Sequence, residues 1–164
     1  MSQWFDTWDI ANLHQKEELQ IEGLKESVAS IRLLVNREVA SLGGQREKVV
    51  LAGLSQGGAT AVHTVLNVAK GLGGLMVFSG RMPFSGRTLA KMRSILDLAE
   101  VPEDDNAVRT TPVLVQHCTN DPLSRVQNGR EVRNSLSSFD AQVEWREYPT
   151  DAAAWLRARV FNEN

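Results

Sequence analysis

The sequence predicts an α/β fold with about four parallel strands and with helices on both faces of the sheet. Four short apolar runs, near residues 48–54, 74–79, 112–117 and 142–148, alternate with longer segments of helical character. Strands that alternate with helices form parallel sheets joined by crossover connections. Runs such as Val49-Val50-Leu51-Ala52 also have the composition of strands that are buried on both faces.

The helical segments follow the same order along the chain. Apolar residues recur at spacings of three and four from Ile21 to Val35, so a helix is expected over residues 21–40, ended by Gly43-Gly44. Further helices are expected over residues 58–70, 88–100 and 124–138, and a short one over 151–161. Residues 1–17, 80–86 and 101–111 are expected to be loops.

Length and composition narrow the class of protein. A chain of 164 residues is expected to form a single domain over residues 1–164, and a net charge of −2 argues against nucleic-acid binding. No apolar run reaches the roughly 20 residues of a membrane span, and no secretory signal opens the chain. The single cysteine, Cys118, indicates a reducing, cytoplasmic location and is more typical of a small buried side chain than of a nucleophile. No His or Cys cluster has metal-ligand spacing, so we expect neither a metal nor a cofactor.

The most informative motif is Gly53-Leu54-Ser55-Gln56-Gly57, between a predicted strand and a predicted helix. A Gly-x-Ser-x-Gly sequence in this position is typical of the nucleophile elbow of serine hydrolases. A Cβ at position 53 or 57 is expected to collide as the helix packs against the strand, and Gly53 and Gly57 remove this collision. Ser55 would then be an exposed nucleophile, and the backbone N–H of Gln56 would point to the site where an oxyanion forms.

Several segments together resemble the acyl-protein thioesterase and carboxylesterase family of α/β-hydrolases, over roughly residues 4 to 150. They are the entry segment Trp4-Phe5-Asp6, the helix start at residues 22–27, the nucleophile signature at 50–59, residues 79–83, and the loop from His117 to Leu123. The resemblance implies a partial α/β-hydrolase fold, with Ser55 as nucleophile and Asp121 as the acid of the triad.

The same resemblance implies a substrate class. Family members hydrolyse fatty acyl thioesters on proteins, lysophospholipids and simple carboxylic esters. The partner expected for this chain is therefore an acylated protein or a lipid-like ester. Trp4 and the Arg81-Met82-Pro83 segment correspond to family positions near the active site and the acyl group, so we expect them to bind substrate.

The family pattern lacks its base in this sequence. The family histidine follows the last strand, at a position that corresponds here to Ala153 or Ala154, and no histidine follows Asp121. His63 is expected to lie too far along its helix to reach Ser55, and His14 and His117 match no family position for the base. We also expect the family's upstream strands and oxyanion loop to be missing before Trp4.

These observations leave alternative functions open. The first is a serine hydrolase of the acyl-protein thioesterase type, of which this chain is a partial copy or a truncated product. The second is a family member that binds acyl groups or partners without turnover, and the third is an unrelated flavodoxin-like module. Because the strand at residues 49–54 is apolar and has no upstream neighbour, we also expect self-association through an exposed sheet edge, unless Trp4, Phe5 and Trp8 cover it.

Overall fold

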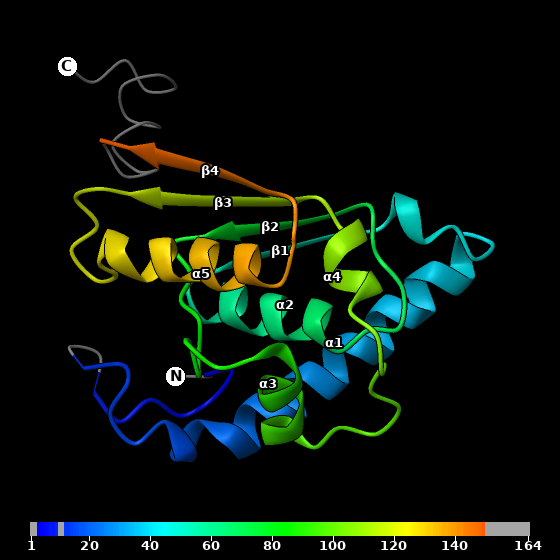
Figure 1. Cartoon of the computed structure of the whole chain (residues 1–164), viewed down its shortest axis with the longest axis horizontal. Coiled ribbons are helices and arrows are strands. Elements are labelled where there is room, and N and C mark those ends of the chain that lie inside the picture. Colours follow the sequence, from blue (N-terminus) through cyan, green and yellow to red (C-terminus); the bar gives the residue numbers. More distant parts are fainter. Residues whose placement is uncertain (1–2, 10–11, 150–164) are drawn as a thin grey trace.

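The computed structural model describes residues 3–9 and 12–149 (Figure 1). Its centre is a sheet formed by β1 (Val50–Leu54), β2 (Gly74–Phe78), β3 (Val113–Cys118) and β4 (Val143–Tyr148). All neighbouring strands are parallel, and they lie side by side in chain order, β1-β2-β3-β4. The prediction of about four parallel strands is confirmed, and each strand lies within two residues of its predicted bounds.

The helices largely follow the sequence periodicity. They are α1 (Ile21–Ser41), α2 (Gln56–Leu66), α3 (Leu89–Leu96), α4 (Asn106–Thr110) and α5 (Val126–Ser138), with short 3-10 turns η1 (Glu17–Gln20) and η2 (Arg46–Lys48). The prediction of a helix over residues 21–40 is confirmed by α1, whereas α4 lies in a segment predicted to be a loop. The short helix predicted over 151–161 lies outside the described residues. None of the helices in the described ranges is long and apolar enough to cross a membrane.

The described helices pack on one face of the sheet, so the prediction of helices on both faces was wrong for this part of the chain (Figure 1). Pairing aligns Gly53, Val77, Val115 and Trp145 across the four strands, and side chains of this row pack with α1, α2 and α5 in one apolar cluster. The physical reason is the strand order. Right-handed crossovers that always advance in the same direction place every connecting helix on the same side of the sheet.

The opposite face and both edges of the sheet, at β1 and at β4, are open among the described residues. The side chains of Val50 and Leu54 are 55% and 67% exposed, and Ala52 between them is exposed as well. Within residues 3–9 and 12–149, β1 pairs only with β2, so it is an edge strand there, as expected from the sequence. The predicted cover by aromatic residues is partial, because Phe5 is buried elsewhere and Trp8 is 58% exposed.

Candidate functional site

Ser55 occupies the single-residue turn between β1 and α2. Its backbone has φ 54° and ψ −120°, a conformation that residues with a Cβ rarely adopt. The Ser55 N–H donates a hydrogen bond to the Phe78 carbonyl (2.9 Å), and its carbonyl accepts one from the Ala59 N–H (3.2 Å). The Ser55 side chain is exposed and does not cap α2. The strained turn therefore presents the hydroxyl to solvent at the carboxyl end of β1.

Two glycines allow this turn, but they are not the two that the motif suggests. A Cβ on Gly53 would lie 2.3 Å from the carbonyl oxygen of Gly57, so the strand and the helix could not approach as they do. A Cβ on Gly57 would lie 3.5 Å from the indole nitrogen of Trp4, an ordinary contact. The second tight position is Gly58, where a Cβ would lie 3.1 Å from both the Gly53 carbonyl oxygen and Val77 Cγ1. The predicted steric role is thus correct for Gly53 and wrong for Gly57.

Gln56 is the first residue of α2 and directly follows Ser55. The first N–H groups of a helix have no partner within the helix, and they lie at the positive end of its dipole. The Gln56 N–H is therefore available to a developing negative charge beside Ser55, as the sequence predicts for an oxyanion donor. The Gln56 side chain contacts residues 4–7, which the sequence did not indicate.

Asp121 lies in the loop after β3, held in a compact turn. Its Oδ1 accepts hydrogen bonds from the N–H groups of Leu123 and Ser124, both 2.9 Å long. Partial burial by itself would raise the pKa of Asp121. The two N–H donors, the Ser79 hydroxyl and nearby His117 outweigh this effect and hold the pKa below its usual value. Asp121 is thus an ionised carboxylate at neutral pH.

Ser55 and Asp121 share one edge of the sheet. Ser55 follows β1, Ser79 follows β2 and Asp121 follows β3, and the carboxyl ends of parallel strands meet at a common edge. Ser79 lies between the other two: its N–H donates to the Gln116 carbonyl on β3 (2.9 Å), and its hydroxyl is one of the groups that lower the pKa of Asp121. Sequence reasoning did not assign Ser79 this role, because its signal was only a serine at the end of a strand.

Two of the three histidines are buried away from Ser55. His117 is the penultimate residue of β3, and its Nε2 donates to the Ser124 carbonyl in the loop before α5 (2.8 Å). Gly129 of α5 lies so close that a Cβ there would be 2.5 Å from His117 Nδ1. His63 lies inside α2, and its Nε2 donates to the Pro83 carbonyl (3.2 Å). Burial lowers the pKa of His63 to about 4, so this ring is neutral near pH 7.

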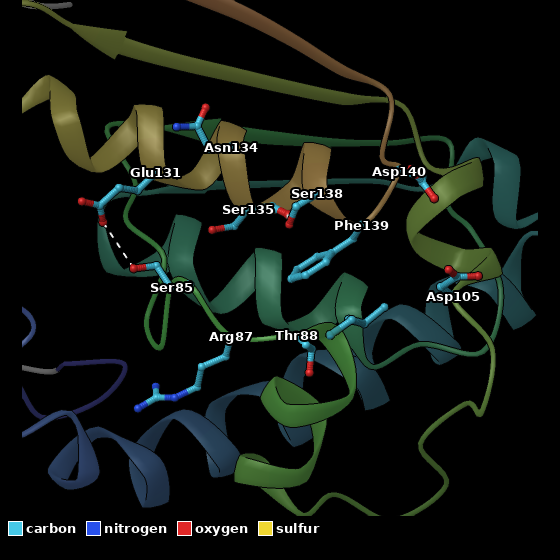
Figure 2. A pocket seen from close by; sticks show the side chains of 12 residues that line it. Ser85, Arg87, Thr88, Asp105, Glu131, Asn134, Ser135, Ser138, Phe139 and Asp140 are labelled. Carbon is cyan, nitrogen blue, oxygen red and sulfur yellow. Dashed lines mark hydrogen bonds between the residues drawn. The ribbon is translucent and has the colours of Figure 1, made fainter.

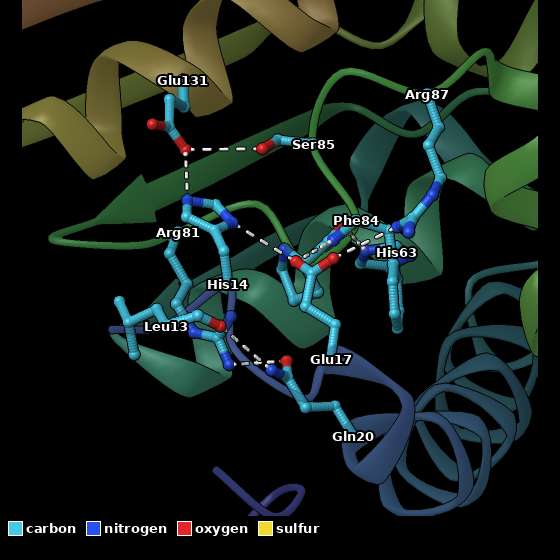
Figure 3. Close-up of polar contacts among 11 residues, drawn as sticks. Leu13, His14, Glu17, Gln20, His63, Arg81, Phe84, Ser85, Arg87 and Glu131 are labelled. Atoms are coloured by element: carbon cyan, nitrogen blue, oxygen red, sulfur yellow. Dashed lines mark hydrogen bonds and ion pairs between the residues drawn. The ribbon is translucent and has the colours of Figure 1, made fainter. Parts of the chain in front are cut away.

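His14 belongs to a polar cluster beside η1 (Figure 3). Its Nδ1 lies 3.4 Å from Glu17 and its Nε2 lies 3.3 Å from Glu131 of α5. No hydrogen bond joins any of the three histidines, all within the described residues, to Ser55. The family position of the base, Ala153 or Ala154, lies outside the described residues.

The predicted substrate-binding residues differ in accessibility. Trp4 is 45% exposed and lines a hollow of about 290 Å³ with Gly53, Leu54 and Gly57. Arg81, Met82 and Pro83 are enclosed by protein. Arg81 is only 7% exposed and Met82 belongs to the main apolar cluster. The Pro83 carbonyl accepts a hydrogen bond from His63. Arg81 donates to Gln20 (2.7 Å) and lies over the Phe5 ring, and burial lowers its pKa to about 10 (Figure 3).

Another hollow, of about 800 Å³, lies between α5 and the segment at 85–89, which leads into α3 (Figure 2). Hydroxyl and carboxylate side chains line it, among them Ser135, Ser138 and Glu131 of α5. It contains none of the predicted site residues. Among the described residues, no group of three or more His, Cys, Asp or Glu side chains could hold a metal ion.

Comparison with known proteins gives the family. The family model described as phospholipase/carboxylesterase matches residues 1–158. The chain belongs to this family. The resemblance inferred from the nucleophile signature and the Asp121 loop is thereby confirmed at the level of the phospholipase/carboxylesterase family.

Relatives within the phospholipase/carboxylesterase family are named as thioesterases and carboxylesterases. Acyl-protein thioesterase 1 of Gibberella zeae is 32% identical over 153 residues, 91% of this chain and 60% of that protein. A protein of Oryza sativa subsp. japonica, named probable inactive carboxylesterase, is 30% identical over 90% of this chain and 55% of its own length. The crystal structure of Arabidopsis thaliana SOBER1 superimposes with a TM-score of 0.72 at 29% identity, covering 96% of this chain and 70% of that one. The chain thus spans little more than half the length of the curated relatives it matches.

Proposed function

We propose that the chain carries the nucleophile of a serine hydrolase that cleaves acyl thioesters or carboxylic esters. The observation that carries this proposal is the strained Ser55 turn at the amino end of α2, with the ionised Asp121 on the same sheet edge. Strain of this kind costs roughly 1–3 kcal/mol and is typical of functional sites. In this chain the strained backbone keeps the Ser55 hydroxyl exposed to solvent.

The chemistry would proceed in two steps. Ser55 Oγ attacks the carbonyl carbon of the substrate and loses its proton to a base, and the thiol or alcohol leaves with a proton. The acyl group is then an ester on Ser55, which water hydrolyses to release a carboxylic acid and restore the hydroxyl. The Gln56 N–H would stabilise the negative oxygen in both steps. The expected substrates are acylated proteins or lysophospholipid-like esters, by analogy with relatives named acyl-protein thioesterase.

A second function is tested beside the first because none of the three histidines, which all lie in the described part of the chain, hydrogen-bonds Ser55. A family member without a base would bind acyl groups or a partner with little turnover. The relative named probable inactive carboxylesterase shows that the family includes proteins so described. Loss of one member of a triad lowers kcat by up to about 10⁶, so the two functions predict very different rates.

A fluorophosphonate probe separates the two, because it labels only an activated serine. The hydrolase proposal expects labelling of the full chain, with slow turnover of short p-nitrophenyl esters, and expects both to vanish in Ser55→Ala. Ser94→Ala, at an exposed serine of α3, is the matched control and should label like the wild type. An unlabelled wild-type chain would support the binding function. Labelling that persists in Ser55→Ala would contradict the assignment of the nucleophile.

The same proposal includes self-association of the chain and a cytoplasmic location. The free edge of β1, with exposed Val50, Ala52 and Leu54, supports association of two copies of the chain. The chain has a single free cysteine, Cys118, which supports a cytoplasmic location for the protein.

A further inference from the structure

The side chain of Gln56 connects the nucleophile turn to a distant part of the chain. Its Oε1 accepts a hydrogen bond from the Trp4 N–H (3.3 Å). Its Nε2 donates to the Phe5 carbonyl (3.2 Å) and to the Thr7 hydroxyl (3.1 Å). Both hydrogens of the amide are therefore used, and the three bonds bridge about fifty residues of sequence. A half-buried glutamine with this many partners on one segment fixes that segment relative to α2.

The same segment is held from its other side by α1. A Cβ on Gly23 would lie 2.9 Å from the Phe5 Cα, so the absence of a side chain there lets residues 4–5 lie against the helix. The Ser27 hydroxyl donates to the Trp4 carbonyl, and the Phe5 ring is buried in a cluster with Leu24. The chain from Trp4 to Thr7 is thus docked between α1 and the amino end of α2.

This docking places Trp4 beside the nucleophile turn. The Trp4 indole nitrogen lies 3.5 Å from the point that a Cβ on Gly57 would occupy. The ring is half-exposed and forms one wall of the hollow that Gly53 and Leu54 also line. Leu54 directly precedes Ser55, so the indole offers an apolar surface next to the turn that carries the proposed nucleophile.

We propose that Gln56 is a positioning residue, whose carboxamide holds Trp4 against the nucleophile turn so that the indole forms a wall for the substrate's acyl chain. The inference rests on the proposed function of Ser55. One residue then serves two parts of the site: its backbone N–H faces the oxyanion, and its side chain sets the acyl wall. The acyl chain recognised in this way is a linear alkyl chain long enough to reach the indole.

The positioning role can be measured without any activity. Gln56→Met removes all three hydrogen bonds at similar side-chain length, and Gln56→Glu keeps the acceptor for the Trp4 N–H while losing both donors. Exchange of the Trp4 amide hydrogen should be about fivefold faster in Gln56→Met, the effect of one hydrogen bond, and closer to wild type in Gln56→Glu. Gln127→Met, on the exposed face of α5, is the control and should leave this exchange unchanged.

The acyl wall is tested with two fluorophosphonates, one carrying a methyl group and one a long alkyl chain. Gln56→Met should lower the rate of Ser55 labelling by the long-chain probe about tenfold and change the methyl probe much less. Trp4→Ala should give the same selective loss, and the double variant should lose no more than either single one. An equal loss with both probes would overturn the acyl wall.

The two readouts separate the possible failures. Unchanged Trp4 exchange in Gln56→Met would overturn the positioning role whatever the labelling shows. A wild-type chain that neither probe labels would overturn the proposed function, and with it the acyl wall, while the exchange data would still decide whether Gln56 fixes the segment.

Discussion

Alanine at each of the three glycines around the Ser55 turn should have a different effect on stability, in an order that the motif alone does not give. The Cβ of Gly53→Ala would meet the Gly57 carbonyl oxygen at 2.3 Å and its carbon at 2.5 Å. Both atoms are backbone, so no side chain can rotate to make room. The Cβ of Gly58→Ala would meet two atoms at 3.1 Å, and that of Gly57→Ala meets nothing closer than 3.5 Å.

These distances convert to a graded loss of stability. Overpacking costs typically 1–3 kcal/mol, and a clash between backbones belongs at or above the top of that range, so we expect at least about 3 kcal/mol for Gly53→Ala. Gly58→Ala requires a shift of a few tenths of an ångström and should cost about 1 kcal/mol. Gly57→Ala replaces a helical glycine by the best helix former and should be neutral or stabilising by up to about 1 kcal/mol.

Urea unfolding of the three variants measures this series. For a chain of this size, 1 kcal/mol also shifts the melting temperature by roughly 2–4 °C, so the order can be checked by heating. Equal slopes of unfolding free energy against urea would show that the variants keep the same folded and unfolded states. If Gly57→Ala proved as damaging as Gly53→Ala, the packing of α2 against β1 described above would be wrong.

Three further substitutions test two buried contacts and the exposed edge of β1. Burial lowers the folded-state pKa of His63 to about 4, so its contribution to stability is complete above pH 6.5 and is lost as the pH falls towards 4, by at most about 3 kcal/mol. His63→Gln should therefore make the free energy of unfolding in urea depend less on pH between 6.5 and 4. An unchanged pH dependence in His63→Gln would contradict the burial of a neutral ring. Gly129→Ala should cost about 2 kcal/mol in urea unfolding, because its Cβ would lie 2.5 Å from His117 Nδ1, and a stabilised variant would place His117 elsewhere. Val50→Lys should lower any concentration-dependent association in sedimentation velocity, since a charge on an edge strand opposes pairing; association equal to wild type would exclude the β1 edge.

The parts of the fold that the sequence predicted are those set by local pattern. The strands follow apolar runs, α1 follows a clear three-four spacing, and the turn at Ser55 follows from a five-residue motif. The short helix α4 was missed because its five residues include only two buried apolar ones, Ala107 and Val108, too few to show a period. The side of the sheet covered by helices depends on strand order, which no local pattern contains.

Within the site, sequence reasoning located residues better than it located contacts. Ser55, Gln56 and Asp121 follow strand or turn signals and lie at one sheet edge. The groups that influence them come from distant segments: Ser79 helps to lower the pKa of Asp121, and Trp4 hydrogen-bonds the Gln56 side chain. The burial of Arg81, Met82 and Pro83 likewise depends on distant residues, since Phe5 and Gln20 contact Arg81 and Glu17 binds the next residue along this loop.

Backbone contacts alone set the geometry of the Ser55 turn, so this geometry does not require a base. Ser55 is held by the Phe78 carbonyl, by the Ala59 N–H and by the close approach of Gly53 to α2, all of which are backbone contacts. Asp121 is fixed by two N–H groups of its own loop. Catalysis in triad enzymes is a property of nucleophile, base and oxyanion donors acting together. The formed turn thus makes Ser55 the residue to probe, while the rate of any acyl transfer depends on groups that the turn itself does not supply.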